Sequence, residues 1–119
     1  MHAKNVIGRE GEDLAVQHLE EAGFVVLERN WRCELGEIDI IARDGDVLVV
    51  CEVKTRSGLG FGTPLEGVTW EKAARLRRLA GRWLATHPGS WGGPVRIDVV
   101  GVLRRDPDPA AIEHVRGVD

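Results

Sequence analysis

The segment from Gly36 to Arg56 constrains this chain most, because it places charged residues inside a strongly apolar hairpin. Its first half alternates and then becomes apolar, and the Asp44-Gly45 pair is typical of a tight turn. The run from Val47 to Val53 is almost entirely β-branched or aliphatic, which indicates a buried strand. Charged side chains are rarely buried unless they are paired or bind a metal, so those in this hairpin need a reason. They are Glu37, Asp39, Glu52 and Lys54.

The length of the turn decides whether these side chains share a face, since side chains alternate along a strand. A two-residue loop at Asp44-Gly45 places Asp39 and Glu52 on one face as diagonal neighbours, with Glu37 and Lys54 on the same face. A four-residue loop keeps that parity and places Asp39 directly opposite Glu52. A three-residue loop separates the two acids onto opposite faces. The Asp-Gly pair favours the first arrangement.

Two carboxylates this close repel each other unless a cation lies between them. Mg²⁺ takes oxygen ligands and is typically held by one or two carboxylates together with water and substrate phosphate. Lys54 follows Glu52 by two residues and lies on its face, where an ammonium group would hold a water molecule or stabilise charge on a phosphoryl group. The pattern predicts metal-assisted hydrolysis of a phosphodiester.

Asp39, followed after 12 residues by Glu52-Val53-Lys54, resembles the active-site hairpin of the PD-(D/E)xK, or restriction-endonuclease-like, nucleases. Glu37-Ile38 stands where the name of that family places a proline, and the Gly-x-x-Asp-Ile-Ile-Ala strand looks more like the archaeal Holliday-junction resolvases. An ordered set of motifs over nearly the whole chain is similar to the bacterial YraN-like family. The motifs are Gly8-Arg9-Glu10-Gly11-Glu12, Asn30-Trp31-Arg32-Cys33, Gly36-Glu37-Ile38-Asp39, Glu52-Val53-Lys54-Thr55-Arg56, Phe61-Gly62 and Lys72.

The resemblance implies an α/β fold, a restriction-endonuclease-like α-β-β-β-α-β(-β) sandwich around a central mixed sheet, in a single endonuclease-like domain over residues 1–119. It implies that Glu12 in the first helix is a third acid. Glu12, Asp39 and Glu52 would then hold Mg²⁺ or Mn²⁺ and act with Lys54 in catalysis. Glu37 would be an outer ligand or a partner of Lys54. Resolvase-like relatives are dimers, which raises a homodimer as one arrangement.

The first helix is predicted from Gly8 to Gly23, after a loose leader over residues 1–6. Gly8 and Gly11 are poor helix formers, so their presence indicates close approach of the backbone either to the sheet or to a phosphate. Glu12 lies at the edge of the apolar stripe, from where it would reach over the sheet toward the acids of the hairpin. The alternative is a solvated carboxylate like the other acids of this helix.

A second helix is predicted from an N-cap at Thr69 to about His87, after a glycine-rich segment that borders the site and lacks regular structure. The stretch 71–82 carries five bases and one acid, although the whole chain has a net charge of −3. This charged stripe is either a phosphate-binding ridge or an ordinary solvated surface. The residues predicted to bind nucleic acid are Lys72, Arg75, Arg78, Arg82 and, at the end of the hairpin, Arg56.

The remaining strands are expected at Phe24 to Arg29, followed by a loop over 30–35, at Pro94 to Leu103, and at a short edge strand within 111–118. Asp98 is expected to be structural or to be a partner for an arginine at the end of the strand. With 119 residues, 43% of them apolar, the chain is large enough for one core without staples.

Cysteine content and hydropathy predict the cellular compartment. Cys33 and Cys51 do not make a disulfide framework, which favours reduced thiols in a cytoplasmic protein. No signal peptide is evident, and no apolar run approaches the roughly 20 residues that a membrane span needs. The sequence therefore predicts no membrane partner.

Three functions follow from these observations. The first is a Mg²⁺-dependent endonuclease acting on DNA, in branched or structured forms. The second is a nucleic-acid-binding accessory protein that has a nuclease fold but does not cleave. The third is a protein-interaction module whose acids are satisfied by arginines such as Arg43 and Arg56.

Overall fold

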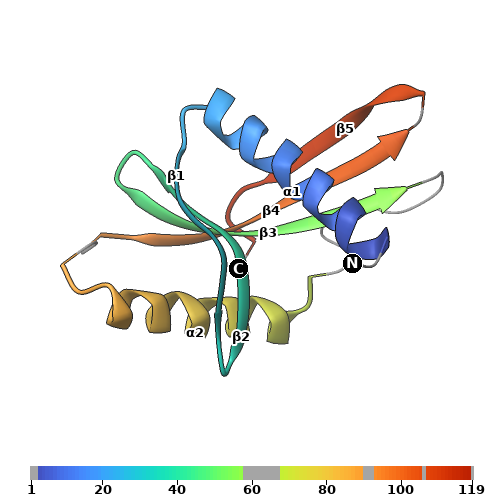
Figure 1. The fold of residues 1–119 in the computed structure, drawn as a ribbon. Helices are drawn as coiled ribbons and strands as arrows, with labels where there is room; N and C mark the ends of the chain where they lie inside the picture. The colour runs from blue at the N-terminus through green and yellow to red at the C-terminus, as the bar shows by residue number, and fades with distance from the viewer. Residues whose placement is uncertain (1–2, 58–67, 90–92, 106, 119) are drawn as a thin grey trace.

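A computed structural model describes residues 3–57, 68–89, 93–105 and 107–118 of the chain. Helices and strands follow one another in the order α-β-β-β-α-β-β, which confirms the predicted order (Figure 1). Most of the glycine-rich segment before the second helix, residues 58–67, lies outside the described residues. The elements are α1 Ala3–Glu21, β1 Val25–Cys33, β2 Gly36–Asp44, β3 Val47–Ser57, α2 Trp70–Thr86, β4 Val95–Arg105 and β5 Asp108–Val115.

The five strands form one mixed sheet in the order β1-β2-β3-β4-β5. Strands β3 and β4 are parallel, and the other neighbours are antiparallel. A parallel pair needs a crossover connection, which α2 provides. The two helices lie on opposite faces of the sheet (Figure 1). The result is an α/β sandwich compatible with the restriction-endonuclease-like fold.

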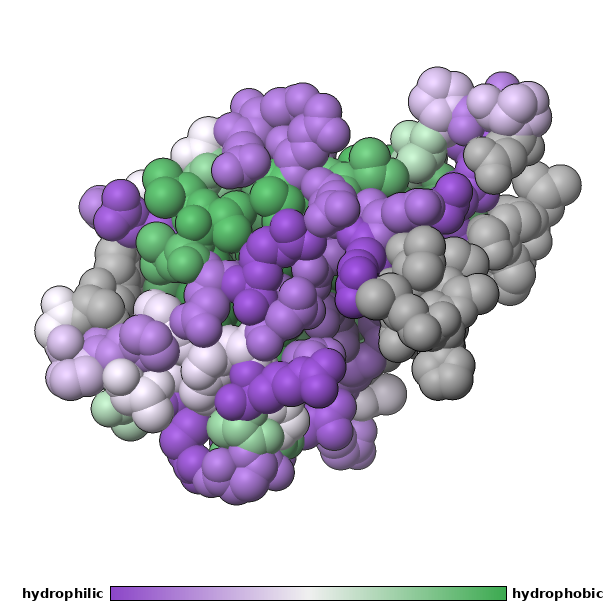
Figure 2. Space-filling view, viewed as in Figure 1, coloured by the Kyte–Doolittle hydropathy of each residue, from purple (hydrophilic) through white to green (hydrophobic). Residues whose placement is uncertain are grey.

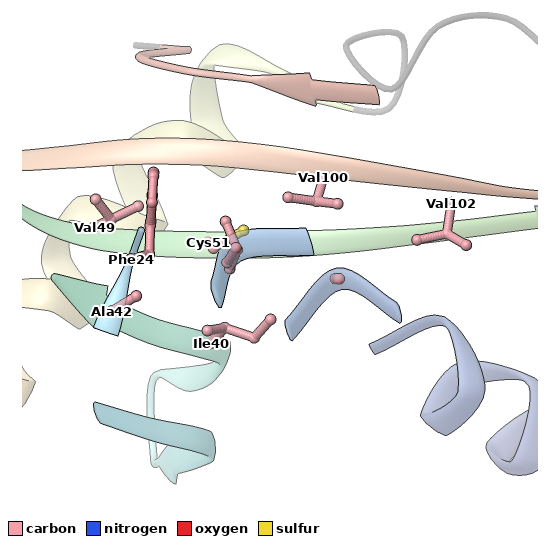
Figure 3. Packing of buried hydrophobic residues seen from close by; sticks show 9 residues of the cluster. Phe24, Ile40, Ala42, Val49, Cys51, Val100 and Val102 are labelled. Carbon is pink, nitrogen blue, oxygen red and sulfur yellow. The ribbon is translucent and has the colours of Figure 1, made fainter. Parts of the chain in front are cut away.

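Each face of the sheet has its own apolar cluster. Under α1, Leu19 and Phe24 pack with Val49 and Cys51 (Figure 3). Under α2, the neighbouring β3 residues Leu48 and Val50 pack with Leu76, Leu79 and Trp83. Because β3 is covered on both faces, both sets of alternate residues must be apolar, which explains the unbroken apolar run in the sequence.

Two boundaries differ from the predictions. Helix α1 begins at Ala3 rather than at Gly8, so most of the expected leader is helical. Strand β1 continues to Cys33 through the expected loop over 30–35, because it stays paired with β2 as far as Gly36. Asn30, a residue common in loops, has a φ of 54° in the left-handed region, which asparagine tolerates. A loop-like residue therefore lies within a paired strand.

The two glycines of α1 have different surroundings. A Cβ atom added to Gly11 would lie 2.0 Å from Oγ1 of Thr55, whereas one added to Gly8 would meet nothing within 4 Å. Of the two explanations given for these glycines, close approach to the sheet is therefore confirmed at Gly11. Because Gly11 has no Cβ atom, α1 can lie close to Thr55 of β3 at the residue next to Glu12.

The turn of the central hairpin is displaced by one residue from the predicted position. Asp44 pairs with Val47, so the two-residue loop is Gly45-Asp46, and Gly45 has a φ of 58°. Asp44 also accepts a hydrogen bond from Nη2 of Arg96 at 3.1 Å. This ion pair with β4 helps to keep Asp44 in the strand, and the predicted Asp44-Gly45 loop is wrong for that reason.

Apolar residues also reach the surface at one edge of the sheet. Val25 and Leu27 of β1 are exposed, and Figure 2 shows apolar surface below the end of α1, over the start of β1.

Both cysteines are free, Cys33 half-buried and Cys51 buried in β3. Within the described residues, no helix has both the length and the apolar character needed to cross a membrane.

Candidate active site

The candidate site lies where β2 separates from β3. Their paired register ends at Ile40 opposite Cys51. The next residue, Asp39, turns its carboxylate onto β3, where Oδ2 accepts a hydrogen bond from the backbone N–H of Val53 at 2.8 Å. Extended by one residue, the register places Asp39 beside Glu52, as in the four-residue-loop alternative. The diagonal arrangement is wrong, but the predicted parity of the pairing holds.

Asp39 is a carboxylate with few compensating groups. Burial, the largest cause, and the negative charges of Glu52, Glu37 and Glu12 together raise its pKa to about 6. The hydrogen bond from Val53 offsets only part of that effect. A cation placed among these acids would therefore be strongly stabilised.

Glu52 is the second carboxylate of the site. Its Oε1 lies 3.0 Å from Nζ of Lys72, and its side chain is only 16% exposed. Its other oxygen, Oε2, is buried and has no hydrogen-bond partner in the part of the chain that the structure describes. An unsatisfied buried carboxylate oxygen is unfavourable, so one ligand position of Glu52 is open to a cation or a water.

Two lysines face Glu52 from different elements. Lys54 comes from β3 and Lys72 from the first turn of α2. Burial and the hydrogen bond to Lys72 lower the pKa of Lys54, although the charge of Glu52 opposes that shift. Burial lowers the pKa of Lys72 too, but its hydrogen bonds to Lys54 and Glu52 outweigh burial and raise it. Lys54 is therefore the amine that gives up its proton more readily.

Glu12 lies on α1, 7% exposed, with its carboxylate already bound. Its Oε2 accepts hydrogen bonds from Nε of Arg29 at 3.0 Å, from Nη2 of Arg29 at 2.6 Å and from Nδ2 of Asn30 at 3.0 Å. The alternative of a solvated carboxylate is therefore wrong. Sequence reasoning missed Arg29 and Asn30 as its partners, and Asn30 in the matched Asn-Trp-Arg-Cys motif was the available signal.

The fit to a metal ion is partial. Among the described residues, no three carboxylate, imidazole or thiolate groups are gathered into a ready-made metal site. Glu12 is held by Arg29 and Asn30, so the predicted set of three acids is not assembled. Mg²⁺ needs only one or two carboxylates, however, and the unpartnered Oε2 of Glu52 beside Asp39 fits such a ligand.

The other predicted site residues divide into two groups. Glu37 bonds Arg32 at 2.6 Å rather than Lys54. Arg82 bonds Glu34 in the β1–β2 turn. The remaining members of the basic stripe, together with the residue at the end of the hairpin, are exposed. They are Arg75, Arg78 and Arg56.

Asp98 on β4, a carboxylate outside the candidate site, lies on the α1 side of the sheet and is fully buried. Arg96 donates to both of its oxygens, at 2.8 and 3.0 Å. The ring of His114 lies 2.8 Å from Oδ2, and the backbone N–H of Gly117 donates to Oδ1 at 3.1 Å. This confirms that Asp98 is structural with an arginine partner. We call this group the Asp98 cluster: Arg96, Asp98, His114 and Gly117.

Comparison with known proteins identifies the family. A family model described as "Uncharacterised protein family UPF0102" matches residues 11–102. A UPF0102 protein of Kineococcus radiotolerans is 58% identical over 118 residues, covering 99% of this chain and 97% of the relative. The UPF0102 protein of Streptomyces coelicolor is 60% identical, covering 99% of this chain and 92% of the relative. The chain belongs to the UPF0102 family.

This result confirms the resemblance found in the sequence, because UPF0102 is the YraN-like family and part of the restriction-endonuclease-like superfamily. The part of the chain that matches the UPF0102 model contains every residue of the candidate site, from Glu12 to Arg82. His114 of the Asp98 cluster lies beyond it.

Proposed function

We propose that this UPF0102 protein is a Mg²⁺-dependent endonuclease that hydrolyses phosphodiesters of DNA, in branched or structured forms. The observation that carries the proposal is the buried, unpartnered Oε2 of Glu52 next to Asp39. An arrangement built only for stability would have satisfied that oxygen. Such a pair, opening between two strands of a rigid sheet, suits a metal ion that binds together with a substrate phosphate.

Each residue of the site would have a separate part. Asp39 and Glu52 would hold the ion, which on binding supplies a Lewis acid and an activated water. Lys54, whose amine is the more easily deprotonated of the two lysines, would position that water at the phosphorus atom. Glu12 would join as the third acid only after Arg29 and Asn30 release it.

The basic stripe of α2 would hold the nucleic-acid backbone. Arg75 and Arg78 are exposed, and each is one helical turn from another base of the stripe. Contacts to phosphate release counterions, so the affinity should fall steeply with salt. Arg75→Ala with Arg78→Ala should weaken binding for all sequences and flatten the salt slope. Unchanged binding would remove α2 from the interface.

The direct test measures cleavage of flap, junction, single-stranded and duplex DNA with Mg²⁺ or Mn²⁺. Glu52→Gln removes one ligand charge and should abolish turnover. Glu113→Gln, an exposed acid on edge strand β5, is the matched control and should cleave like the parent. Cleavage that survives in the Glu52→Gln protein would contradict the assignment. We expect this activity in the cytoplasm, where the free cysteines stay reduced.

A second candidate function is nucleic-acid binding without cleavage. It is favoured by the protein's own cations, since Lys72 binds Glu52 and Arg29 binds Glu12 where a metal would otherwise be needed. Salt-dependent binding without turnover of any of the substrates would support it. An interaction module, with its acids satisfied by arginines, has less support. Arg29 binds Glu12 and Arg32 binds Glu37, but Asp39 and Oε2 of Glu52 have no arginine partner among the described residues.

A further inference from the structure

Lys72 was predicted to lie on the outer basic stripe, but the structure turns it inward. Thr69 caps α2 by accepting a hydrogen bond from the backbone N–H of Lys72 at 3.1 Å, which sets the position of the first turn. The Lys72 side chain, 22% exposed, then reaches Oε1 of Glu52 at 3.0 Å. A residue expected to bind phosphate instead binds the carboxylate that would bind the metal.

We propose that Lys72 is an internal cation that occupies Glu52 until a nucleic-acid phosphate draws it away, so that metal loading depends on bound nucleic acid. This inference rests on the proposed metal-dependent function and adds an order of binding to it. Nucleic acid would bind first, Lys72 would move from the carboxylate to the phosphate, and the metal would then bind Asp39 and Glu52.

The charges around Glu52 explain why Lys72 must move. With Lys72 in place, the negative charge of Glu52 is largely compensated, and Lys54 lies beside both groups. A divalent ion on the same carboxylate would bring two positive charges close to the ammonium group of Lys72. Lys72 at Oε1 and an ion at the open Oε2 would therefore compete for the negative charge of one carboxylate, and metal binding alone must displace Lys72 without compensation.

A phosphate removes that penalty, because it offers Lys72 another anion. Lysine is a compact charge on a flexible stem, which suits transfer between two anions a short distance apart. Arg75 lies one helical turn after Lys72 and is exposed. A phosphate bound by Arg75 would lie within reach of Lys72, since residues at this spacing are neighbours on a helix surface.

The consequence is reciprocal coupling between metal and nucleic acid. If nucleic acid strengthens metal binding by some factor, the metal strengthens nucleic-acid binding by the same factor. Without nucleic acid, the Glu52–Lys72 pair weakens metal binding.

The experiment measures Mn²⁺ binding to the full chain by electron paramagnetic resonance, with and without a nuclease-resistant phosphorothioate DNA junction. For the parent protein, the DNA should lower the Kd for Mn²⁺ by at least about fivefold, within the usual range of allosteric coupling. Lys72→Met should bind Mn²⁺ about fivefold tighter than the parent without DNA, and DNA should then tighten it little further. Lys72→Gln, which keeps a polar group without the charge, should behave like Lys72→Met.

Arg43→Met, at an exposed position near the turn of the hairpin, is the matched control and should bind Mn²⁺ like the parent. If the parent binds Mn²⁺ equally well with and without DNA, and both Lys72 variants bind it no tighter, the inference is wrong and the metal site stands. If neither the parent nor any variant binds Mn²⁺ even with DNA, the proposed function fails together with the inference.

Discussion

Two carboxylates of one sheet, the half-buried Asp39 on β2 and the buried Asp98 on β4, have opposite electrostatic environments. Asp98 accepts four hydrogen bonds, two from Arg96, one from His114 and one from Gly117. Burial opposes ionisation of Asp98, but these donors outweigh it and lower the pKa. Among the described residues, Asp39 accepts a hydrogen bond from the backbone N–H of Val53 alone and has several acidic neighbours. Burial is the main reason that its pKa is raised to about 6.

The opposite pKa shifts of Asp98 and Asp39 distinguish a structural carboxylate, Asp98, from one that suits cation binding, Asp39. Desolvation acts on both, so what distinguishes them is the supply of donors. Asp98 accepts hydrogen bonds from Arg96 on β4, from His114 on β5 and from Gly117 after β5. Its carboxylate therefore links these three segments. At Asp39 the sheet provides one donor, and Glu52 beside it keeps an oxygen without a partner. The uncompensated carboxylates of the site lower the stability of the metal-free protein, and a bound cation would offset this loss.

The largest expected effect is on the Asp98 cluster. Asp98→Ala leaves Arg96 and His114 without their shared acceptor, and breaking a buried pair from one side typically costs about 3–5 kcal/mol. Urea denaturation should show this loss in the free energy of unfolding. Asp108→Ala, an exposed acid on β5, should change it by no more than about 0.5 kcal/mol. A loss below about 1 kcal/mol for Asp98→Ala would remove the contrast between the two regions.

A second effect concerns pH. The folded pKa of Asp39, about 6, lies above its ordinary value of 3.8, so the ionised form is the costly one in the folded state. The parent should therefore gain stability relative to Asp39→Asn as pH falls from about 7 to 4, by roughly 3 kcal/mol at most. Asp98 has the opposite sign, because its pKa is lowered. Its contribution is present above pH 3.8 and is lost as pH falls through its folded pKa.

The measurement is a set of denaturation curves for the parent and for Asp39→Asn between pH 4 and pH 8. The difference between the two proteins isolates Asp39 from His18, whose pKa is lowered mainly by burial. A difference that stays constant over this range would mean that Asp39 is ionised without cost.

A third effect concerns Glu52 and metal. Without metal, Glu52→Gln should lie within about 1 kcal/mol of the parent, because it removes repulsion with Asp39 but also the contact with Lys72, which is partly exposed. In the presence of DNA, Mg²⁺ at a hundredfold excess over Kd should stabilise the parent by about 2.7 kcal/mol beyond the effect of DNA, and should not stabilise the variant beyond the effect of DNA. Thermal melts of both proteins check this. A loss near 3–5 kcal/mol in the metal-free variant would instead make Glu52 a structural ion-pair partner.

The sequence predicted the order of elements, because periodicity reports burial on each face of a strand. The apolar run of β3 is an example, since it is buried under both helices. The sequence also predicted the parity that brings Asp39 and Glu52 together. It did not predict the exact turn, because Asp44 is kept in its strand by Arg96, about fifty residues away in the chain.

The site was less predictable than the fold, because its state depends on contacts between distant elements. Lys72 lay in a regular basic stripe, and helical spacing alone cannot show that one member turns inward to Glu52. Arg29, the last residue of the predicted strand, and Asn30, in the part of β1 beyond that predicted end, both reach Glu12 on α1. Periodicity identified the acids, but their partners come from tertiary packing.

The smallest expected effect concerns α1, which contacts both the surroundings of the candidate site, through Glu12, and the Asp98 cluster, through His18. Glu12 lies near its middle, and His18, one and a half turns on, packs edge-to-face against His114 of the Asp98 cluster at 5.4 Å. Gly11→Ala would place a methyl group 2.0 Å from Oγ1 of Thr55, so α1 must move away from β3. Overpacking of this kind typically costs about 1–3 kcal/mol.

The displacement should act at the Glu12 end of α1 and leave the Asp98 end intact. Amide shifts by nuclear magnetic resonance should change at Asn30 and Glu12 more than at His114. Gly8→Ala, where nothing lies within 4 Å, is the matched control and should stabilise the protein by up to about 1 kcal/mol through helix propensity. Thr55→Ala combined with Gly11→Ala should restore part of the loss, since the two changes share one contact. Equal shifts at both ends of α1 would mean that the helix moves as a rigid body and that the two regions are mechanically coupled.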